Sequence, residues 1–481
     1  MPSNGQDMTE QLPDENASVY KNTLFYSKAN EELMSFLMAN EEETALLAKQ
    51  AKGEDLMDVS YDLSAWPALI NKQKLADFDQ FVKNVPTLFE KAIKIFFAQD
   101  SQLFATYLDE PQLTHEQFLE ARMDKSDLVS RYDLVYSGAT PKLLEVNVSS
   151  NLGGWELDWL HLKALNATNN LPFIQKYKLS YHKVVKSLFN GLGKSIARLK
   201  KENKTGNILI CTEIVSAEVS AGLSQFAQMN YQTSGFYQKG QVFLTPDSKK
   251  IQFDAEGNVS YNGISYDAVM LLDKASTPDE IMDQLISSYM AKKIIFPDSP
   301  VHKLYGNKML MALVHEEKVK ARLTDEEVRW IEKYIPWTAR NDQQHITWNN
   351  NVYPRLELLM QQKDAFVLKK AQSLQGKDVI VGKFTGQEEW DARLESLARE
   401  PGWIIQAYCS PDVIFASDGD SRVSEYIPIW GAFGFGGSYG GSFIRGSTKS
   451  KLDSGVVNCA VGAIVVIALE CESISRQKLS L

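Results

Sequence analysis

The run Ser130-Arg-Tyr-Asp-Leu-Val-Tyr136, a turn at Gly138 and the run Pro141-Lys-Leu-Leu-Glu-Val-Asn147 predict two β-strands joined as a hairpin. Before this hairpin, from Ala29 to about Phe97, apolar residues recur at three- and four-residue spacing, which predicts helices. The change of period between the two segments therefore marks the start of a β-containing region.

Four polar side chains are spaced so that the hairpin can gather them. Residues two positions apart on a strand project to one face, so Arg131 pairs with Asp133 and Glu145 with Asn147. Antiparallel pairing can bring the two pairs together. Two carboxylates and an amide oxygen suit Mg²⁺, which keeps coordination places for water and phosphate oxygens. The spacing alone equally allows a solvated polar face with an incidental salt bridge.

Composition excludes several classes of protein. Of the 481 residues, 44% are apolar and 23% charged, values typical of a globular chain rather than a disordered or fibrous one. Acidic residues outnumber basic ones, 61 to 51, so general nucleic-acid binding is not expected. The longest nearly apolar stretch, Cys459–Leu469, is shorter than the about 20 residues of a membrane helix.

The termini and cysteines favour a cytoplasmic protein. Residues Met1 to Ser18 are polar and acidic, unlike a secretory signal, and are expected to form a mobile leader. The four cysteines form no CxxC pair and the six histidines no HExxH motif, so neither a disulfide framework nor a zinc site is predicted.

Beyond the hairpin, helical and strand patterns alternate. Asn207–Thr212, Ser265–Asp273 and Ile294–Pro300 predict strands of a small, mostly parallel sheet, with a helix over Ser216–Met229. Further strands are predicted at Ala365–Lys369, Trp403–Tyr408 and Ala463–Ile467. Gly193-Lys194-Ser195 is not a P-loop, because Leu188 stands where the motif requires glycine.

Six glycines lie between Gly431 and Gly441, which suits a flexible lid, a close backbone approach to phosphate, or a turn or bulge between strands. The run contains no G-x-G-x-x-G, because Tyr439 occupies the place of the third glycine. No dinucleotide site is therefore predicted.

Arg131-x-Asp133 followed by Glu145-x-Asn147 resembles the magnesium-binding motif of ATP-grasp enzymes, particularly the circularly permuted, glutathionylspermidine synthetase-like branch. Similar elements follow in the permuted order, from Leu128 to about Val466: Asn307-Lys308 opening a helix, Phe366–Lys369 followed by Ser373 and Gly376, the strand Trp403–Tyr408, and Gly440–Arg445 with Asn458 downstream.

The resemblance implies a mixed α/β (α+β) protein with a circularly permuted ATP-grasp fold. The implied divisions are a mobile leader (1–18), a helical N-terminal region (19–127), the magnesium-motif part (128–204), a Rossmann-like pre-grasp domain (205–300) and the nucleotide-binding part (301–481).

The resemblance also implies the ligands and the residues that hold them, with ATP and Mg²⁺ as cofactors. The expected magnesium ligands are Asp133, Glu145 and Asn147; Arg131 and Arg445 hold the transferring phosphoryl group or tetrahedral intermediate; Lys308 and Lys369 hold the ATP phosphates; Gln406, Ala407 and Tyr408 line the adenine region; Ser149 and Ser150 hold the carboxylate substrate. Lysine ammonium groups are compact charges suited to a polyphosphate.

The sequence departs from the family at two places. Lys370 follows the strand lysine where proline is usual, and the next loop carries Ser-Leu-Gln-Gly rather than a run of glycines. The stretch Val148–Gly154 lacks the Thr- and Pro-rich character of glutathionylspermidine synthetases, so the substrate is expected to be neither glutathione nor spermidine. No amidase-like N-terminal domain is visible.

The implied function is an ATP-dependent carboxylate–amine ligase that forms an amide through an acyl phosphate and releases ADP and phosphate. Its expected partners are a small carboxylate and a small amine, such as an amino acid or short peptide, with no nucleic acid or membrane. Two alternatives remain: a phosphotransferase on the same fold, and an inactive nucleotide-binding interaction protein. The sequence does not indicate an oligomeric state.

Overall fold

The structure is a computed structural model that describes residues 27–40, 61–121, 123–200, 206–213, 217–235, 239–272, 277–373, 378–397, 400–417, 423–459 and 462–472. The leader predicted for residues 1–18 lies outside them. Several sheets combine with helices in a mixed α/β architecture, as the sequence predicted. Among the helices described, none has both the length and the apolar composition needed to cross a bilayer.

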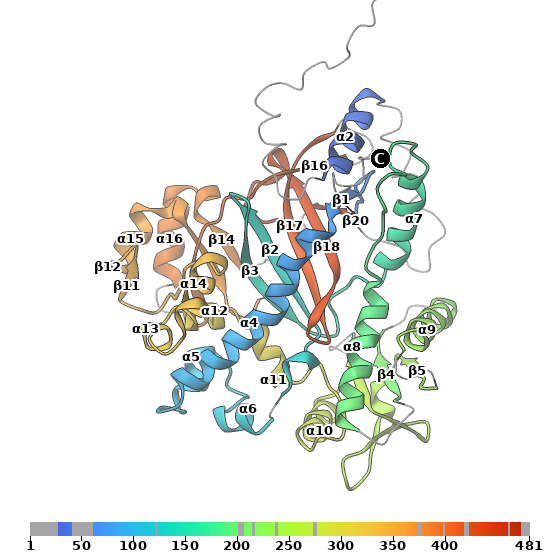
Figure 1. Cartoon of the computed structure of the whole chain (residues 1–481). Coiled ribbons are helices and arrows are strands. Elements are labelled where there is room, and N and C mark those ends of the chain that lie inside the picture. The colour runs from blue at the N-terminus through green and yellow to red at the C-terminus, as the bar shows by residue number, and fades with distance from the viewer. Residues whose placement is uncertain are drawn as a thin grey trace, which may run out of the picture.

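A six-stranded antiparallel sheet forms the centre of the molecule (Figure 1). Its order is β19 (Ile464–Val466), β18 (Ser438–Thr448), β17 (Ser424–Phe435), β2 (Ser130–Ser137) and β3 (Thr140–Val148), with β16 (Ile414–Ala416) paired to β17. Strands β2 and β3 confirm the predicted hairpin. Strand β17 pairs with β2, so segments about 300 positions apart in the sequence form one surface.

A register shift in the hairpin places its polar side chains. Asp133 pairs with Glu145, but Leu134 pairs with Leu143, so Leu144 is an additional residue on β3. This bulge turns both Leu144 and Glu145 toward the same face of the sheet, where they line one pocket. Leu143 stays buried on the opposite face.

Helix α4 (Leu75–Phe96) packs on the other face of the central sheet. The N-terminal region also contains α2 (Lys28–Ala39), α5 (Leu103–Leu108) and α6 (His115–Ala121). Phe78 of α4 stacks on Trp430 of β17 with ring centroids 6.2 Å apart. Strand alternation turns Trp430 toward α4 and its neighbour Ile429 toward the pocket. This region also contains a strand that the helical prediction missed, β1 (Ala68–Asn71), parallel to β20 (Ala468–Cys471).

A second antiparallel sheet has the order β10 (Thr338–Arg340), β15 (Trp403–Ala407), β13 (Phe366–Lys370) and β14 (Val379–Val381). Phe366 and Leu368 pack with Trp390 of α16 (Gln387–Leu397) in one apolar cluster, which also includes residues of α15 (Arg355–Gln361). The alternate residues Val367 and Lys369 face the pocket. The hairpin of β11 (His345–Trp348) and β12 (Asn351–Pro354) adjoins this unit.

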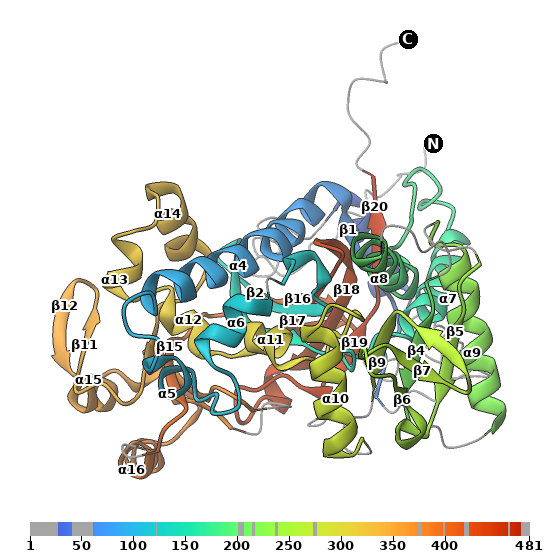
Figure 2. The ribbon, with the colours of Figure 1, turned by 90° about the horizontal axis from the view of Figure 1, so that it is seen from below.

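The predicted parallel sheet lies on the other side of the central sheet from β10–β15, as Figures 1 and 2 show. It contains β5 (Val242–Thr245), β4 (Ile208–Cys211) and β9 (Ala268–Leu271), beside a small antiparallel sheet of β6 (Gln252–Phe253), β7 (Val259–Tyr261) and β8 (Ile264–Tyr266). The helices of this region are α7 (Leu157–Asn169), α8 (Val184–Leu199), α9 (Ala217–Gln232) and α10 (Asp279–Met290).

The strand predicted over Ile294–Pro300 was wrong. Only Ile295 makes a parallel bridge, to Ala268. The chain then turns because Ser299 caps α11 (Pro300–Lys303), and Pro300 suits the first turn of a helix. Further α-helices in the described part of the chain are α12 (Met309–Leu313), α13 (Glu317–Lys320) and α14 (Asp325–Tyr334).

The glycine-rich run is a hairpin turn with a bulge, as one of its interpretations held. Gly436 and Gly437 have φ values of 60° and 74°, a conformation that favours glycine. A Cβ on Gly191 of α8 would lie 2.7 Å from the Gly436 nitrogen, so the turn packs directly on that helix. Residues 431–441 do not line the pocket described next.

Candidate active site

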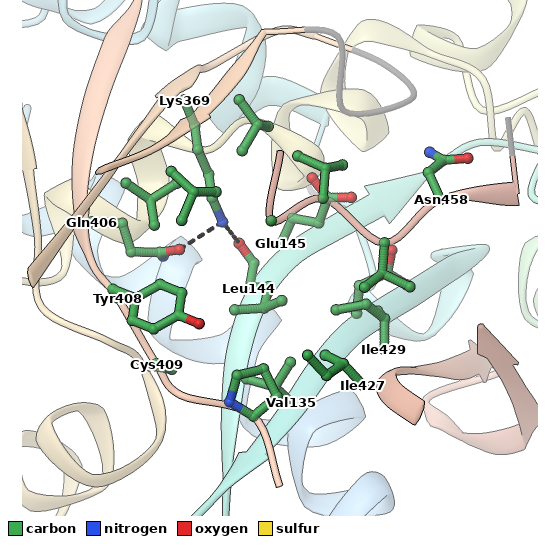
Figure 3. Close-up of a pocket in the computed structure, with 18 of the residues that line it drawn as sticks. Val135, Leu144, Glu145, Lys369, Gln406, Tyr408, Cys409, Ile427, Ile429 and Asn458 are labelled. Carbon is green, nitrogen blue, oxygen red and sulfur yellow. Dashed lines mark hydrogen bonds between the residues drawn. The ribbon is translucent and has the colours of Figure 1, made fainter. Parts of the chain in front are cut away.

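A pocket of about 880 Å³, counting the part open to solvent, lies between the central sheet and the four-stranded sheet (Figure 3). Asp133, Glu145 and Arg445 line it from the central sheet. Lys369 and Gln406 line it from the other sheet. The segment from Leu452 to Asn458 contributes a further wall. Residues predicted from distant parts of the sequence thus meet at one cavity.

Asp133 is the centre of a buried charge cluster. Its Oδ1 accepts a hydrogen bond from Arg131 Nε at 2.8 Å, and its Oδ2 accepts one from Arg445 Nη2 at 2.6 Å. Asn147 Nδ2 also donates to Oδ2, at 3.2 Å. Burial by itself would raise the pKa of Asp133, but the two guanidinium groups outweigh burial and hold the pKa well below its usual range. The predicted pairing of the two motif halves is confirmed.

Gly431 makes this cluster possible. It lies on β17 between its partners Asp133 on β2 and Phe443 on β18. A Cβ at this position would lie 2.8 Å from Arg131 Cδ and 2.8 Å from the Phe443 carbonyl oxygen. The missing side chain therefore leaves the space in which Arg131 lies across the sheet.

Lys308 and Glu145 form a second ion pair. Lys308 Nζ lies 3.3 Å from Glu145 Oε2 and donates to the Ser373 carbonyl oxygen at 3.2 Å. Lys308 is the N-cap residue of α12, as the predicted helix start required. Its side chain is 6% exposed, whereas that of Glu145 is 29% exposed. The carboxylate of Glu145 is therefore the more accessible of the two hairpin carboxylates.

Lys369 is buried in the facing sheet. Its Nζ donates to Gln406 Oε1 at 2.6 Å and to the Leu144 carbonyl oxygen at 3.1 Å, so it links the two sheets (Figure 3). Burial lowers the pKa of Lys369 to about 8, with Glu145 opposing the shift and Lys308 adding to it. The Gln406 side chain, predicted for the adenine region, is fully buried and binds Lys369.

At the strand end that is predicted to bind adenine, two backbone amides already donate hydrogen bonds within the protein. The Ala407 amide donates to the Trp337 carbonyl oxygen at 2.8 Å, and the Tyr408 amide donates to that of Ala365 at 2.8 Å. Ala407, Tyr408 and Cys409 all line the pocket. A ligand edge at this place can therefore use carbonyl oxygens or groups after Tyr408, but not those two amides.

Ser149 and Ser150 are held by Asp298 at the start of the loop after β3. Ser149 Oγ donates to Asp298 Oδ1 at 3.2 Å, and the Ser150 amide donates to the same oxygen at 3.0 Å. Asp298 Oδ2 accepts from the Leu271 amide at 3.0 Å. Neither serine lines the pocket. These contacts fasten the hairpin to the end of β9.

The donor set fits a magnesium ion in part. Glu145 offers an accessible carboxylate, and Asn147 donates through Nδ2, which leaves its carbonyl oxygen for a cation. Asp133 is a suitable ligand only if Arg131 or Arg445 turns away, because both arginines occupy its oxygens. Among the residues described, no group of three His, Cys, Asp or Glu side chains is arranged to hold a metal.

Sequence reasoning missed three contributors to the site. The bulge at Leu144 and the pocket-facing Cys409 follow no motif. Gly431 was visible only as one glycine among six. The sequence feature that could have identified Gly431 is its place inside a strand, since a glycine there often marks a close approach by another group.

Comparison with known proteins defines the fold but not the activity. No protein-family model and no curated protein matches the sequence. Among solved structures, the chain is similar to a glutathione synthetase-like effector from Globodera pallida in its apo form, with a TM-score of 0.52 and 11% identity over 92% of this chain and 98% of that one. At this identity, the likeness shows that nearly the whole chain shares the fold of that protein.

A protein from Methylobacillus flagellatus, provisionally named gamma-glutamylcysteine synthetase, aligns over 79% of this chain and 87% of its own at 10% identity. Its TM-score of 0.36 is too low to support an argument about either fold or function.

Proposed function

We propose that the protein is an ATP-dependent carboxylate–amine ligase with a circularly permuted ATP-grasp fold. The carrying observation is that Lys369 and Glu145 line one pocket from two different antiparallel sheets, although they lie more than 200 positions apart. The fold shared with a glutathione synthetase-like protein supports the proposal.

The charges of the pocket suit a polyphosphate. Lys369 and Arg445 line the pocket, whereas Lys308 and Arg131 do not line it but pair with the Glu145 and Asp133 carboxylates that do. Mg²⁺ held by Glu145 and Asn147 would neutralise phosphate charge. Phosphoryl transfer depends mainly on positioning and charge stabilisation, so no protein nucleophile is needed.

The proposed reaction has two steps. A carboxylate oxygen of the substrate forms a bond to the γ-phosphorus as the bond to ADP breaks. The amine nitrogen loses one ammonium proton to solvent and forms a bond to the acyl carbon. The nitrogen then loses a second proton, the bond between the acyl carbon and the phosphate oxygen breaks, and inorganic phosphate leaves with that electron pair. Arg131 and Arg445 are proposed to stabilise the charge on the transferring phosphoryl group and on the tetrahedral intermediate.

The test is product analysis with ATP, Mg²⁺ and an equimolar pool of the twenty amino acids. We expect ADP and an amide in equal amounts, measured by chromatography and mass spectrometry. AMP would contradict the proposal, and a stable phosphorylated product would favour the phosphotransferase alternative.

A matched pair of lysine variants tests whether the activity belongs to this pocket. Lys369→Met should reduce ADP release by orders of magnitude, because a buried phosphate-facing charge is lost. Lys370→Met changes the next residue, which pairs with Glu400 at the surface at 3.0 Å, and should behave like the unmodified protein. Equal rates for both variants would remove Lys369 from the site.

A further inference from the structure

A second group of side chains continues the site beyond the Asp133 cluster. The Phe443 ring lies beside both arginines, with its centroid 5.7 Å from Arg131 Cζ and 5.9 Å from Arg445 Cζ. The Tyr61 ring meets Phe443 edge to face, with centroids 6.2 Å apart. The Tyr61 hydroxyl donates to Glu156 Oε1 at 2.5 Å. This group runs from the proposed phosphoryl site to a carboxylate.

The group is assembled from segments that are far apart in the sequence. Tyr61 precedes β1, Glu156 precedes α7, Phe443 lies on β18, and Cys459 follows the segment that lines the pocket. The thiol of Cys459 interacts electrostatically with Arg131, Arg445 and Glu156, so it lies within the same group. Tyr61, Glu156 and Cys459 are half-buried, which leaves them accessible to a small molecule.

The positive and negative charges of this group lie at its two ends. Arg131 and Arg445 present cations on one side of Phe443, and Glu156 presents an anion beyond Tyr61. Burial and the Glu156 carboxylate raise the pKa of Tyr61 above its usual range, so its hydroxyl stays protonated and donates to Glu156. This donor occupies one carboxylate oxygen and orients the other.

One atom in the group has no protein partner. Arg445 is 8% exposed, and its Nε is buried without a hydrogen-bond partner among the residues described. A buried donor of this kind is costly unless a ligand supplies an acceptor. The anionic end of a substrate is therefore expected at Arg445, and a cationic end fits the opposite charge at Glu156.

We propose that Glu156, oriented by the Tyr61 hydroxyl, binds the ammonium group of the amine substrate. Phe443 and Tyr61 then form an apolar wall along one side of the space that joins this ammonium to the acyl group held at Arg131 and Arg445, so that the nitrogen can reach the acyl carbon once it has lost a proton. The substrate class is a primary amine, such as an amino acid or short peptide with a free amino group. The inference rests on the proposed ligase function, and the experiment separates the two.

The experiment compares two nucleophiles with the same carboxylates. ATP, Mg²⁺ and the pool of twenty amino acids are incubated with or without hydroxylamine, a small nucleophile that is uncharged at neutral pH and converts acyl phosphates to hydroxamates. Hydroxamate formation reports the acyl phosphate, whereas amide formation also requires the amine site. Mass spectrometry measures both products.

For Glu156→Gln, we expect the ratio of kcat/KM for amide formation to that for hydroxamate formation to fall about 10- to 100-fold, through a higher amine KM. Tyr61→Phe keeps the carboxylate but removes its orienting donor, so a smaller fall in the same ratio is expected. Glu120→Gln, at an exposed position of α6, is the control and should not change the ratio.

A binding measurement complements the kinetics. A pool of the twenty amino acid amides, which carry an amine but no carboxylate, should slow iodoacetamide alkylation of Cys459 in the unmodified protein and not in Glu156→Gln. Peptide mapping follows Cys459, with Cys409 as the internal reference.

Each outcome decides one of the two ideas. No hydroxamate and no amide from the unmodified protein overturns the ligase function, and the inference with it. Hydroxamate formation with an unchanged product ratio in Glu156→Gln overturns the inference alone. An equal loss of both products in Glu156→Gln also overturns it, since the residue would then serve folding or the phosphoryl step.

Discussion

Lys369 is buried and lies beside several other titratable groups. Its ammonium faces Glu145, Lys308, Asp133 and Cys409, and burial lowers its pKa to about 8. The protonated form binds phosphate, so in the free protein this form is lost as the pH rises through about 8. The affinity for Mg·ATP should therefore be highest below pH 8 and fall by up to about tenfold per unit above it.

Calorimetric titration of Mg·ATP between pH 7.0 and 9.5 checks this prediction. Lys369→Arg keeps a positive charge over the whole range, since guanidinium pKa values exceed about 12. Its affinity should not show the decrease above pH 8. The same decrease in both proteins would show that another group titrates.

Glu145 is the more accessible hairpin carboxylate and the proposed magnesium ligand. Glu145→Gln removes an ionised ligand but keeps the shape of the side chain, and Lys308 retains the Ser373 carbonyl oxygen as an acceptor. We expect turnover to fall by about 100-fold or more, because metal stabilisation of charge contributes several kcal/mol.

Circular dichroism should show that the Glu145→Gln variant stays folded. Glu425→Gln also removes a carboxylate from the central sheet, but that side chain pairs with Lys449 at the surface. Its turnover should remain normal. A fully active Glu145→Gln variant would exclude this residue from the site.

Strand β17 contains two glycines, and one of them, Gly431, lies where a side chain would displace Arg131. Gly431→Ala would place a methyl group 2.8 Å from Arg131 Cδ and from a strand carbonyl oxygen. The strand cannot move easily between its two neighbours, so we expect a loss of about 1–3 kcal/mol in the free energy of unfolding. Activity should fall further, because Arg131 must leave Asp133.

Chemical denaturation measures the stability of this variant. Gly386→Ala is the matched control, because a Cβ there would meet nothing within 4 Å and the residue precedes α16. Because alanine caps a helix less well than glycine, a loss of less than about 1 kcal/mol is expected. Equal effects of the two substitutions would show that the gap at Gly431 is not required.

At the scale of the whole molecule, the pocket lies between two sheets that are built from separate parts of the chain. Cys409 lies at the end of one sheet and lines the pocket, whereas Cys211 and Cys471 are buried elsewhere. A nucleotide bound between the sheets should cover Cys409. We expect Mg·ATP to slow alkylation of Cys409 by about tenfold or more at saturating concentration, because ligand binding lowers the accessible fraction.

Peptide mapping after maleimide treatment tests this protection. Mg²⁺ alone, without nucleotide, is the control and should leave Cys409 as reactive as before. Protection that requires no nucleotide, or none at all with Mg·ATP, would place the nucleotide outside this pocket.

Much of the site could be predicted because its parts are local patterns. The hairpin from Ser130 to Val148 follows from alternation and a short turn, and alternation also explains why Lys369 faces away from the apolar core of its sheet. Such features depend on neighbouring residues only. The sequence therefore determined which side chains are available and, except at the bulge at Leu144, on which face of these strands they lie.

Only the tertiary structure decided which of those side chains meet. Arg445 reaches Asp133 from 312 positions away, and Arg131 lies in the gap that Gly431 leaves in the strand between them. Lys369 is held by a carbonyl oxygen on the facing sheet, and Ser149 is fastened to Asp298 rather than turned to the pocket. These contacts depend on how separate sheets pack, and local periodicity carries no information about the packing of distant segments.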